Sequence, residues 1–146
     1  MSRIQLALNV SDLGEAIEFY SKFFKTEPAK VREGYANFAI DEPPLKLVLI
    51  ENEGDPGSIN HLGVEVFSTD EVTDASSYLS SVGLATRVEE STTCCFAVQD
   101  KVWVDGVDGS PWEVYTVLED SITTNGIAGD GACCVSPSDS NALTTC

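Results

Sequence analysis

Apolar and polar residues alternate at the start of the chain, and this pattern predicts a β-strand with one aliphatic face. Over residues 4–10 every second position is aliphatic, and the positions between them are polar or small. A period of two is typical of a strand that covers a core with one face. From Leu13 to Phe24 the apolar residues recur every three or four positions instead. That spacing predicts a helix, which Ser11 or Asp12 can cap.

The same order of elements then occurs a second time along the chain. Turns at Gly34 and Pro43-Pro44 separate the strands that follow the first helix, and a Gly-rich turn precedes the last strand. The predicted strands are 28–33, 35–40, 45–51, 61–67, 85–90, 95–104 and 112–118, and the second helix is 69–82. The sequence therefore predicts an α+β fold of two βαβββ modules, at about residues 1–51 and 59–118. We expect them to form a curved half-barrel sheet with the helices outside.

The composition changes after Leu118. Residues 119–146 are mostly Ser, Thr, Gly, Asp, Asn and Ala, with few large apolar side chains. Such a segment cannot bury enough apolar surface to offset its ordering entropy. We therefore divide the chain into one domain at residues 1–118 and a disordered, cysteine-containing tail at 119–146. The role of the tail cysteines stays open between metalloid binding and none; they are Cys133, Cys134 and Cys146.

Composition and charge restrict the possible partners. The chain has 146 residues, 42% of them hydrophobic, and a net charge of −16 with only 8 Lys and Arg residues. A nucleic acid or an anionic membrane surface requires a basic footprint, so both are excluded as partners. The first ten residues lack the apolar core of a signal peptide, and no apolar run approaches the roughly 20 residues of a membrane span. We therefore expect a cytoplasmic protein with reduced thiols.

Three polar residues occupy comparable places in the two predicted modules. Gln5 begins the first strand, His61 begins the first strand of the second module, and Glu113 lies in the last strand. Alternation puts each side chain opposite the aliphatic face, in the hollow of the half-barrel. Each residue alone has an ordinary explanation as a hydrogen-bonded strand residue. Together, an amide oxygen, an imidazole and a carboxylate can hold a divalent first-row metal with open coordination positions, whether Fe, Mn, Co, Ni or Zn.

Several sequence motifs resemble those of a known family. The segments Q-L-A-L-N-V-x-D-L, F-Y-x-K-F-F, N-H-L-G-V-E-V and P-W-E-V-Y resemble the vicinal oxygen chelate superfamily, which includes glyoxalase I, extradiol dioxygenases and fosfomycin-resistance proteins. Within it, Y-A-N-F-A-I, P-P-L-K-L-V-L-I-E and T-C-C-F-A-V-Q-D-K-V-W-V are similar to the organoarsenical C–As lyases (ArsI-type) and the cadmium-induced proteins (CadI-type). The resemblance covers roughly residues 1–118 and implies the vicinal oxygen chelate fold.

The resemblance also implies an activity. It implies an Fe(II)-dependent dioxygenase that cleaves the carbon–arsenic bond of trivalent organoarsenicals with O2, with Gln5, His61 and Glu113 as the Fe(II) ligands. The vicinal pair Cys94-Cys95 carries over as the substrate-binding and catalytic thiols. Trivalent arsenic is soft and prefers thiolates, and a monoalkyl As(III) has two exchangeable positions for two thiolates. Adjacent residues in a regular strand face opposite sides. We therefore expect this pair at the start of a strand, where the regular alternation has not yet begun.

Two other functions stay open. A non-catalytic stress protein that binds Cd(II) or As(III) would use the thiols but not the open metal site. A glyoxalase-like metal-dependent isomerase needs a fourth, acidic ligand in a strand where this chain has Val48, and Glu51 reaches the site only if that strand shifts. Glu65 either supports the metal site or belongs to the charged wall of the hollow, and Tyr35, Asn37 and Tyr115 are expected to face the same hollow. The preferred organoarsenical, and a monomer or a domain-swapped homodimer, stay undecided.

Overall fold

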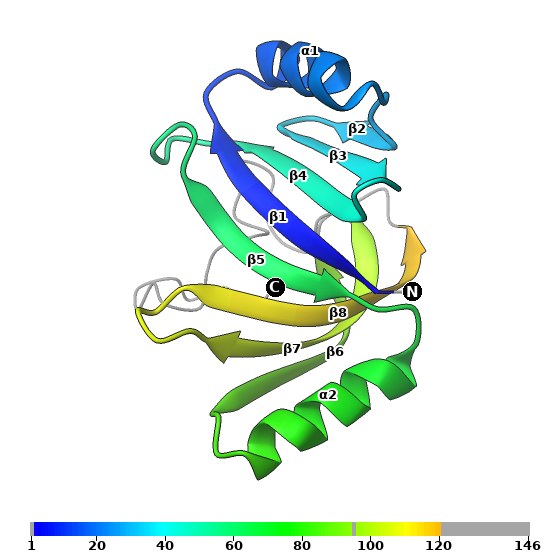
Figure 1. Ribbon diagram of the computed structural model, residues 1–146, viewed down its shortest axis with the longest axis vertical. Helices are drawn as coiled ribbons and strands as arrows, with labels where there is room; N and C mark the ends of the chain where they lie inside the picture. Colours follow the sequence, from blue (N-terminus) through cyan, green and yellow to red (C-terminus); the bar gives the residue numbers. More distant parts are fainter. Residues whose placement is uncertain (1, 95, 121–146) are drawn as a thin grey trace.

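The computed structural model describes residues 2–94 and 96–120. These residues form one eight-stranded sheet that curls into a half-barrel, with one helix outside each half (Figure 1). The elements are β1 (Arg3–Val10), α1 (Leu13–Phe24), β2 (Lys30–Arg32), β3 (Tyr35–Ile40), β4 (Leu45–Glu51), β5 (Ile59–Glu65), α2 (Thr69–Ser81), β6 (Thr86–Cys94), β7 (Ala97–Asp105) and β8 (Pro111–Asp120). The predicted α+β half-barrel of two βαβββ modules is confirmed.

The strand order brings the first strands of the two modules together. The order across the sheet is β2-β3-β4-β1-β5-β8-β7-β6. β1 and β5 are antiparallel neighbours at the centre, while β1 pairs with β4 and β5 pairs with β8 in parallel. As a result, β1, β5 and β8 lie next to one another although they come from the beginning, the middle and the end of the described residues (Figure 1).

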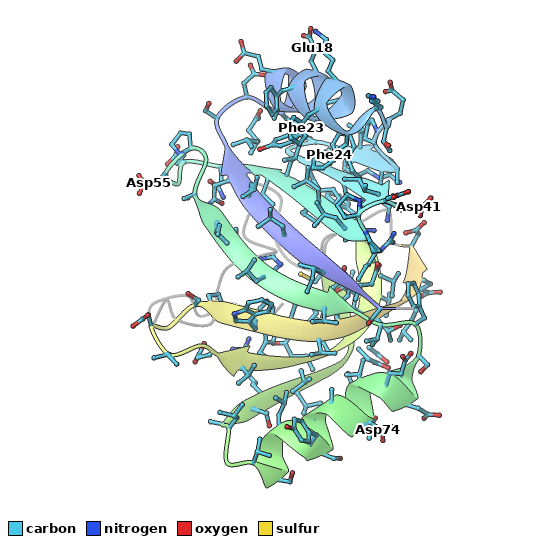
Figure 2. The ribbon with its side chains drawn as sticks, viewed as in Figure 1. Glu18, Phe23, Phe24, Asp41, Asp55 and Asp74 are labelled. Carbon is cyan, nitrogen blue, oxygen red and sulfur yellow. The ribbon has the colours of Figure 1, made fainter. Side chains whose placement is uncertain are left out.

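Both helices cover the aliphatic side of the sheet, as predicted. Leu6, Leu8 and Val10 of β1 pack with residues of α1 against a buried cluster that includes Phe38 and Leu49. In Figure 2, Phe24 lies on the side of α1 that meets the sheet, and Glu18 points away from it. α2 packs in the same way against β7 and β8 through Val72, Ala75 and Leu79. The other face of the sheet is the concave face that collects the polar residues.

Local sequence sets the helix ends. Asp12 caps α1, since its Oδ1 accepts a hydrogen bond from the backbone N–H of Glu15 at 2.8 Å. Ser68 caps α2, since its Oγ accepts a hydrogen bond from the backbone N–H of Glu71 at 3.3 Å. The carboxylate of Glu71 accepts in return from the Ser68 hydroxyl and from the backbone N–H of Phe67, each at 3.0 Å. Such caps each contribute about 1 kcal/mol. Within the described residues, neither helix has the length and apolar composition that crossing a bilayer requires.

The strands around the cysteine pair differ from the prediction. β6 does not end at residue 90 but continues to Cys94, so Cys94 closes one strand instead of opening the next. The expected start of a strand was wrong because a register shift between Glu89 and Thr92 lets β6 resume, with Thr92 paired to Gln99. β8 likewise continues to Asp120, which pairs with Ala97. Cys95 and residues 121–146, including Cys133, Cys134 and Cys146, lie outside the described residues, so the disorder of the tail stays a prediction.

Candidate functional site

The three residues singled out as metal ligands converge on the concave face. Gln5 Nε2 lies 3.0 Å from His61 Nε2 and 2.7 Å from Glu113 Oε1, and His61 Nε2 lies 3.3 Å from the same carboxylate oxygen. All three residues are at most 5% exposed. Each comes from a different one of the adjacent strands β1, β5 and β8. The structure therefore brings together side chains that are far apart in the sequence.

A glycine between two of these residues makes the approach possible. Gly63 of β5 pairs with Gln5 on one side and with Glu113 on the other. A Cβ atom at position 63 would meet Cγ of Glu113 at 3.0 Å and Cβ of Gln5 at 3.4 Å. Any larger residue would therefore push these two side chains apart.

The donor set suits a divalent first-row metal. Ligand atoms in adjacent positions of an octahedral site with bonds near 2.1 Å are roughly 3 Å apart, and the three separations fall around that value. A metal takes the amide oxygen of Gln5, so binding requires this amide to turn over, which exchanges Nε2 and Oε1 in place. Within the described residues, no group of three or more His, Cys, Asp and Glu side chains is arranged to hold a metal ion. The candidate centre therefore depends on the amide.

A lysine that sequence analysis missed holds the carboxylate of this set. Lys101 Nζ of β7 contacts Glu113 Oε2 at 3.0 Å. Burial by itself raises the pKa of Glu113, but the Lys101 ammonium and the His61 ring outweigh burial and lower that pKa to about 2. Burial lowers the pKa of Lys101, and the Glu113 carboxylate raises it above its ordinary value. The alternation of β7, which puts Lys101 and Trp103 on one face, is a signal that could have identified the lysine.

The imidazole of His61 is enclosed on its other sides. The ring of Trp103 meets it edge to face, with centroids 5.6 Å apart. Nδ1 of His61 lies 2.7 Å from Oδ1 of Asn60. The ring is therefore held by contacts beyond the three-residue set.

A cavity of about 290 Å³ opens beside these residues. Gln5, His61 and Glu113 line it together with Cys94. Tyr35, Asn37 and Tyr115 line the cavity as predicted, and so do Lys30, Lys46, Val48, Glu65, Gln99, Lys101, Trp103 and Val117. Desolvation raises the pKa of Tyr35 to about 12, so its hydroxyl stays protonated at neutral pH.

Several polar atoms of the cavity wall lack partners within the chain. Asn37 Oδ1, Gln99 Oε1, Trp103 Nε1 and Tyr115 Oη are buried and have no hydrogen-bond partner among the described residues. A buried polar group without a partner costs roughly 1–3 kcal/mol. The cavity therefore offers donors and acceptors that a small polar ligand can satisfy.

Phe96, which follows the cysteine pair, contacts the opposite module. The ring of Phe96 lies 5.6 Å from that of Tyr35, and Lys30 Nζ donates to the Phe96 carbonyl at 3.2 Å. Lys30 also pairs with Asp120 at the end of β8. Gln99 Nε2 donates to the Cys94 carbonyl at 3.4 Å. These contacts hold Cys94, which is 2% exposed, at the cavity.

The remaining candidate residues lie apart from the three-residue set. Glu65 pairs with Arg3 and, at 3.8 Å, with Lys46. These contacts favour its role as part of the charged wall. Val48 lines the cavity where a fourth ligand would be needed. Glu51 is exposed and its carboxylate accepts from the backbone N–H of Leu13 at 2.6 Å, so it is engaged at the start of α1.

Comparison with known proteins identifies a matching family model and several similar proteins. Residues 3–114 match the family model of the Glyoxalase/Bleomycin resistance protein/Dioxygenase superfamily. The cadmium-induced protein CadI of Mycobacterium tuberculosis is 63% identical over 123 residues, covering 84% of this chain and 81% of that protein. A trivalent organoarsenical cleaving enzyme of Thermomonospora curvata is 58% identical over 143 residues, covering 97% of this chain and 93% of that protein. The 2,3-dioxygenase LapB of Pseudomonas sp. KL28 shares the fold, with a TM-score of 0.60 at 19% identity over 86% of this chain and 43% of that one.

Proposed function

The chain belongs to the glyoxalase/bleomycin resistance protein/dioxygenase superfamily, and we propose that it is an Fe(II)-dependent dioxygenase that cleaves the carbon–arsenic bond of trivalent organoarsenicals. The observation that carries the proposal is that Cys94 lines the same cavity as Gln5, His61 and Glu113. A thiol that suits arsenic and a donor set that suits iron thus face one small volume. The 58% identity to an organoarsenical cleaving enzyme supports the same reaction.

The metal site would be held by the three convergent residues. Gln5 would supply its amide oxygen, His61 Nε2 its lone pair and Glu113 the oxygen that Lys101 does not occupy. Fe(II) bound there supplies the redox chemistry that activates O2. Three protein ligands leave positions open, as in other non-haem iron oxygenases. A neutral amide in place of a second imidazole donates less charge, so we expect the metal to be held more weakly than by two imidazoles.

The two vicinal thiols would hold the arsenic. A monoalkyl arsenite, R–As(OH)2, would form As–S bonds to Cys94 and Cys95. Both As–OH bonds break, and the two hydroxyls leave with the two thiol protons as two water molecules. Once the first As–S bond has formed, the second forms intramolecularly, with the large effective concentration of a chelate. The carbon substituent would then lie in the cavity between Cys94 and the metal ligands. The products would be inorganic arsenite and an oxidised carbon fragment.

A second function is favoured by one specific observation. The M. tuberculosis relative, at 63% identity, carries the name cadmium-induced protein. A protein that binds Cd(II) or As(III) through its thiols without turnover is therefore the alternative to the lyase. Such a protein would retain its metalloid ligand and consume no O2.

One experiment separates the two functions. The protein is loaded with Fe(II) anaerobically, methylarsenite is added, and O2 is then admitted while arsenite and O2 are measured. The lyase releases arsenite with stoichiometric consumption of O2. Tight binding of methylarsenite with no release of arsenite and no loss of O2 supports the binding protein and excludes the lyase. The same experiment with Mn(II), Co(II), Ni(II) or Zn(II) tests the identity of the metal.

A further inference from the structure

A chain of side-chain amides leads away from the imidazole of His61. His61 Nδ1 contacts Oδ1 of Asn60 at 2.7 Å, on the opposite edge of the ring from Gln5 and Glu113. Nδ2 of Asn60 then donates to Oδ1 of Asn9 in β1 at 3.0 Å. The ring is thereby linked through two asparagines to the centre of the sheet.

The direction of every hydrogen bond in this chain is determined at its far end. The Ser58 hydroxyl donates to the backbone carbonyl of Asp55 at 2.5 Å, and a carbonyl oxygen can only accept. Ser58 Oγ therefore accepts from Nδ2 of Asn9 at 2.9 Å. Asp55 lies in the loop that joins β4 to β5, away from the helices (Figure 2).

The direction of these hydrogen bonds determines which ring nitrogen of His61 carries the proton. With Nδ2 of Asn9 donating to Ser58, its Oδ1 accepts from Asn60, and it also accepts from Nδ2 of Asn52 at 2.7 Å. Asn60 consequently presents its own carbonyl oxygen to His61. Because that oxygen only accepts, Nδ1 of the ring carries the proton. In the neutral ring, Nε2 then has the lone pair that a metal requires.

A β-bulge makes the contact between neighbouring residues possible. Successive side chains of a regular strand point to opposite faces, so residues 60 and 61 would not meet. Between β1 and β5, however, Ala7 pairs with His61 while Leu8 pairs with Ile59, which leaves Asn60 as an extra residue. A bulge re-aims the inserted side chain. Asn60 can therefore reach the ring of its own neighbour.

We propose that Asn60 and Asn9 are positioning residues that fix the Nδ1-protonated tautomer and the orientation of His61, so that Nε2 is presented to a divalent metal. The inference rests on the metal site of the proposed function, but not on its arsenic chemistry. A ring without the acceptor at Nδ1 can place its proton on Nε2, where it blocks metal binding. Outer partners of metal-bound histidines typically affect metal affinity by about 10- to 100-fold.

The chain contains a single histidine, which makes the tautomer directly measurable. ¹⁵N-histidine-labelled, tag-free, metal-free full-length protein gives one pair of ring nitrogen signals in a long-range ¹H–¹⁵N spectrum above the titration range of imidazole. Metal affinity is measured separately by titration with Co(II), without any arsenical. The variants are Asn60→Leu, Asn60→Asp and Asn9→Leu. Asn52→Ala is the matched control, since it disturbs the same loop but leaves the contact between Asn60 and Asn9 in place.

We expect the Nδ1-protonated tautomer of His61 in the wild type and in Asn52→Ala. Asn60→Leu is expected to lose the tautomer preference and to bind Co(II) roughly 10- to 100-fold more weakly. Asn9→Leu is expected to weaken the tautomer preference and the Co(II) affinity in the same direction. Asn60→Asp retains the acceptor and is expected to keep Nδ1–H and the wild-type affinity. Nε2–H in the wild type would overturn the proposal, as would an unchanged tautomer in Asn60→Leu or the same loss in Asn52→Ala. If Asn60→Leu does not fold, the wild-type spectrum and Asn9→Leu decide. If these results are obtained but no arsenite is released, the lyase activity is excluded, while the positioning role of Asn60 and Asn9 still stands.

Discussion

Lys101 Nζ lies 3.0 Å from Oε2 of Glu113, and each side chain is only 3% exposed. Because Oε2 of Glu113 is paired with Lys101, it is Oε1 that faces Gln5 and His61. Lys101 therefore helps determine which oxygen of Glu113 is available to a metal, and it keeps a buried negative charge compensated when no metal is bound.

Replacing the lysine tests this compensation. We expect Lys101→Met to destabilise the metal-free protein by about 3–5 kcal/mol, because it leaves a buried carboxylate without its partner. A divalent metal restores a positive charge, so the loss is expected to be smaller in the metal-loaded protein. Urea unfolding with and without Co(II) measures both values. Lys22→Met is the control: its pair with Glu18 is exposed at 73% and 69%, and such pairs contribute at most about 1 kcal/mol. Equal losses in the two variants would contradict the role of Lys101.

The lowered pKa of Glu113 predicts the response of the metal-free protein to acid. Its pKa lies near 2 in the folded protein, against the ordinary value of 4.5. The folded state therefore binds this proton more weakly than the unfolded state, and stability falls as the pH decreases from about 4.5 toward 2. The Glu113→Gln variant should lack this part of the pH dependence. Unfolding free energies over that pH interval provide the measurement, and parallel curves for the two proteins would contradict the assignment.

The metal site itself is tested by removing its ligands. His61→Ala is expected to abolish most binding of Fe(II), since it deletes the only imidazole of the chain. Gln5→Ala and Glu113→Ala are each expected to weaken it. Metal content after anaerobic loading is the measurement. Stoichiometric Fe(II) and normal turnover in His61→Ala would show that the site assignment is wrong.

The cysteine pair is tested separately from the metal. We expect Cys94→Ser and Cys95→Ser each to abolish C–As cleavage while Fe(II) occupancy is retained, because serine cannot replace a soft thiolate toward As(III). One thiolate cannot chelate, so either single variant is expected to lose nearly as much as the double variant. Arsenite release is measured together with iron content. Cleavage retained in both single variants would exclude the chelate, and lost iron in either would assign the cysteines to the metal site.

The composition of the tail also makes a prediction. Deletion of residues 121–146 is expected to leave the melting temperature and the turnover largely unchanged, since the segment carries few large apolar side chains. Thermal unfolding and arsenite release of the truncated protein are compared with those of the full chain. A large drop in melting temperature would show that the segment contributes to the packed domain.

Much of the fold could be predicted because alternation along the strands assigns faces without knowledge of their partners. The period of two in β1 separated the residues packed under α1 from Gln5, and the same reasoning placed His61 and Glu113 on the concave face. The repeated order of elements then implied two modules that together form one curved sheet. These inferences needed only side-chain polarity and spacing.

What could not be predicted depends on pairing between distant segments. β6 continues past residue 90 because Thr92 pairs with Gln99 after a register shift. No local signal in the sequence specifies such a shift. Asn60 contacts His61 only because β5 bulges against β1. Alternation along β7 can assign the face of Lys101, but a lysine is ordinarily expected at the surface. Its burial depends on its pairing with Glu113, twelve residues away on another strand.

The position of the three strands has a consequence for the order of events when the protein is made. Gln5 and Glu113, which are in direct contact, are 108 residues apart in the sequence. Contacts of such separation form late, because the entropy of closing a long loop must be overcome first. The proposed metal site is therefore not formed in an incomplete chain or in either module alone, so a metal can bind there only after both modules have joined. A metal that binds this site in the native state and not in the unfolded state would add to the stability of the finished protein by mass action.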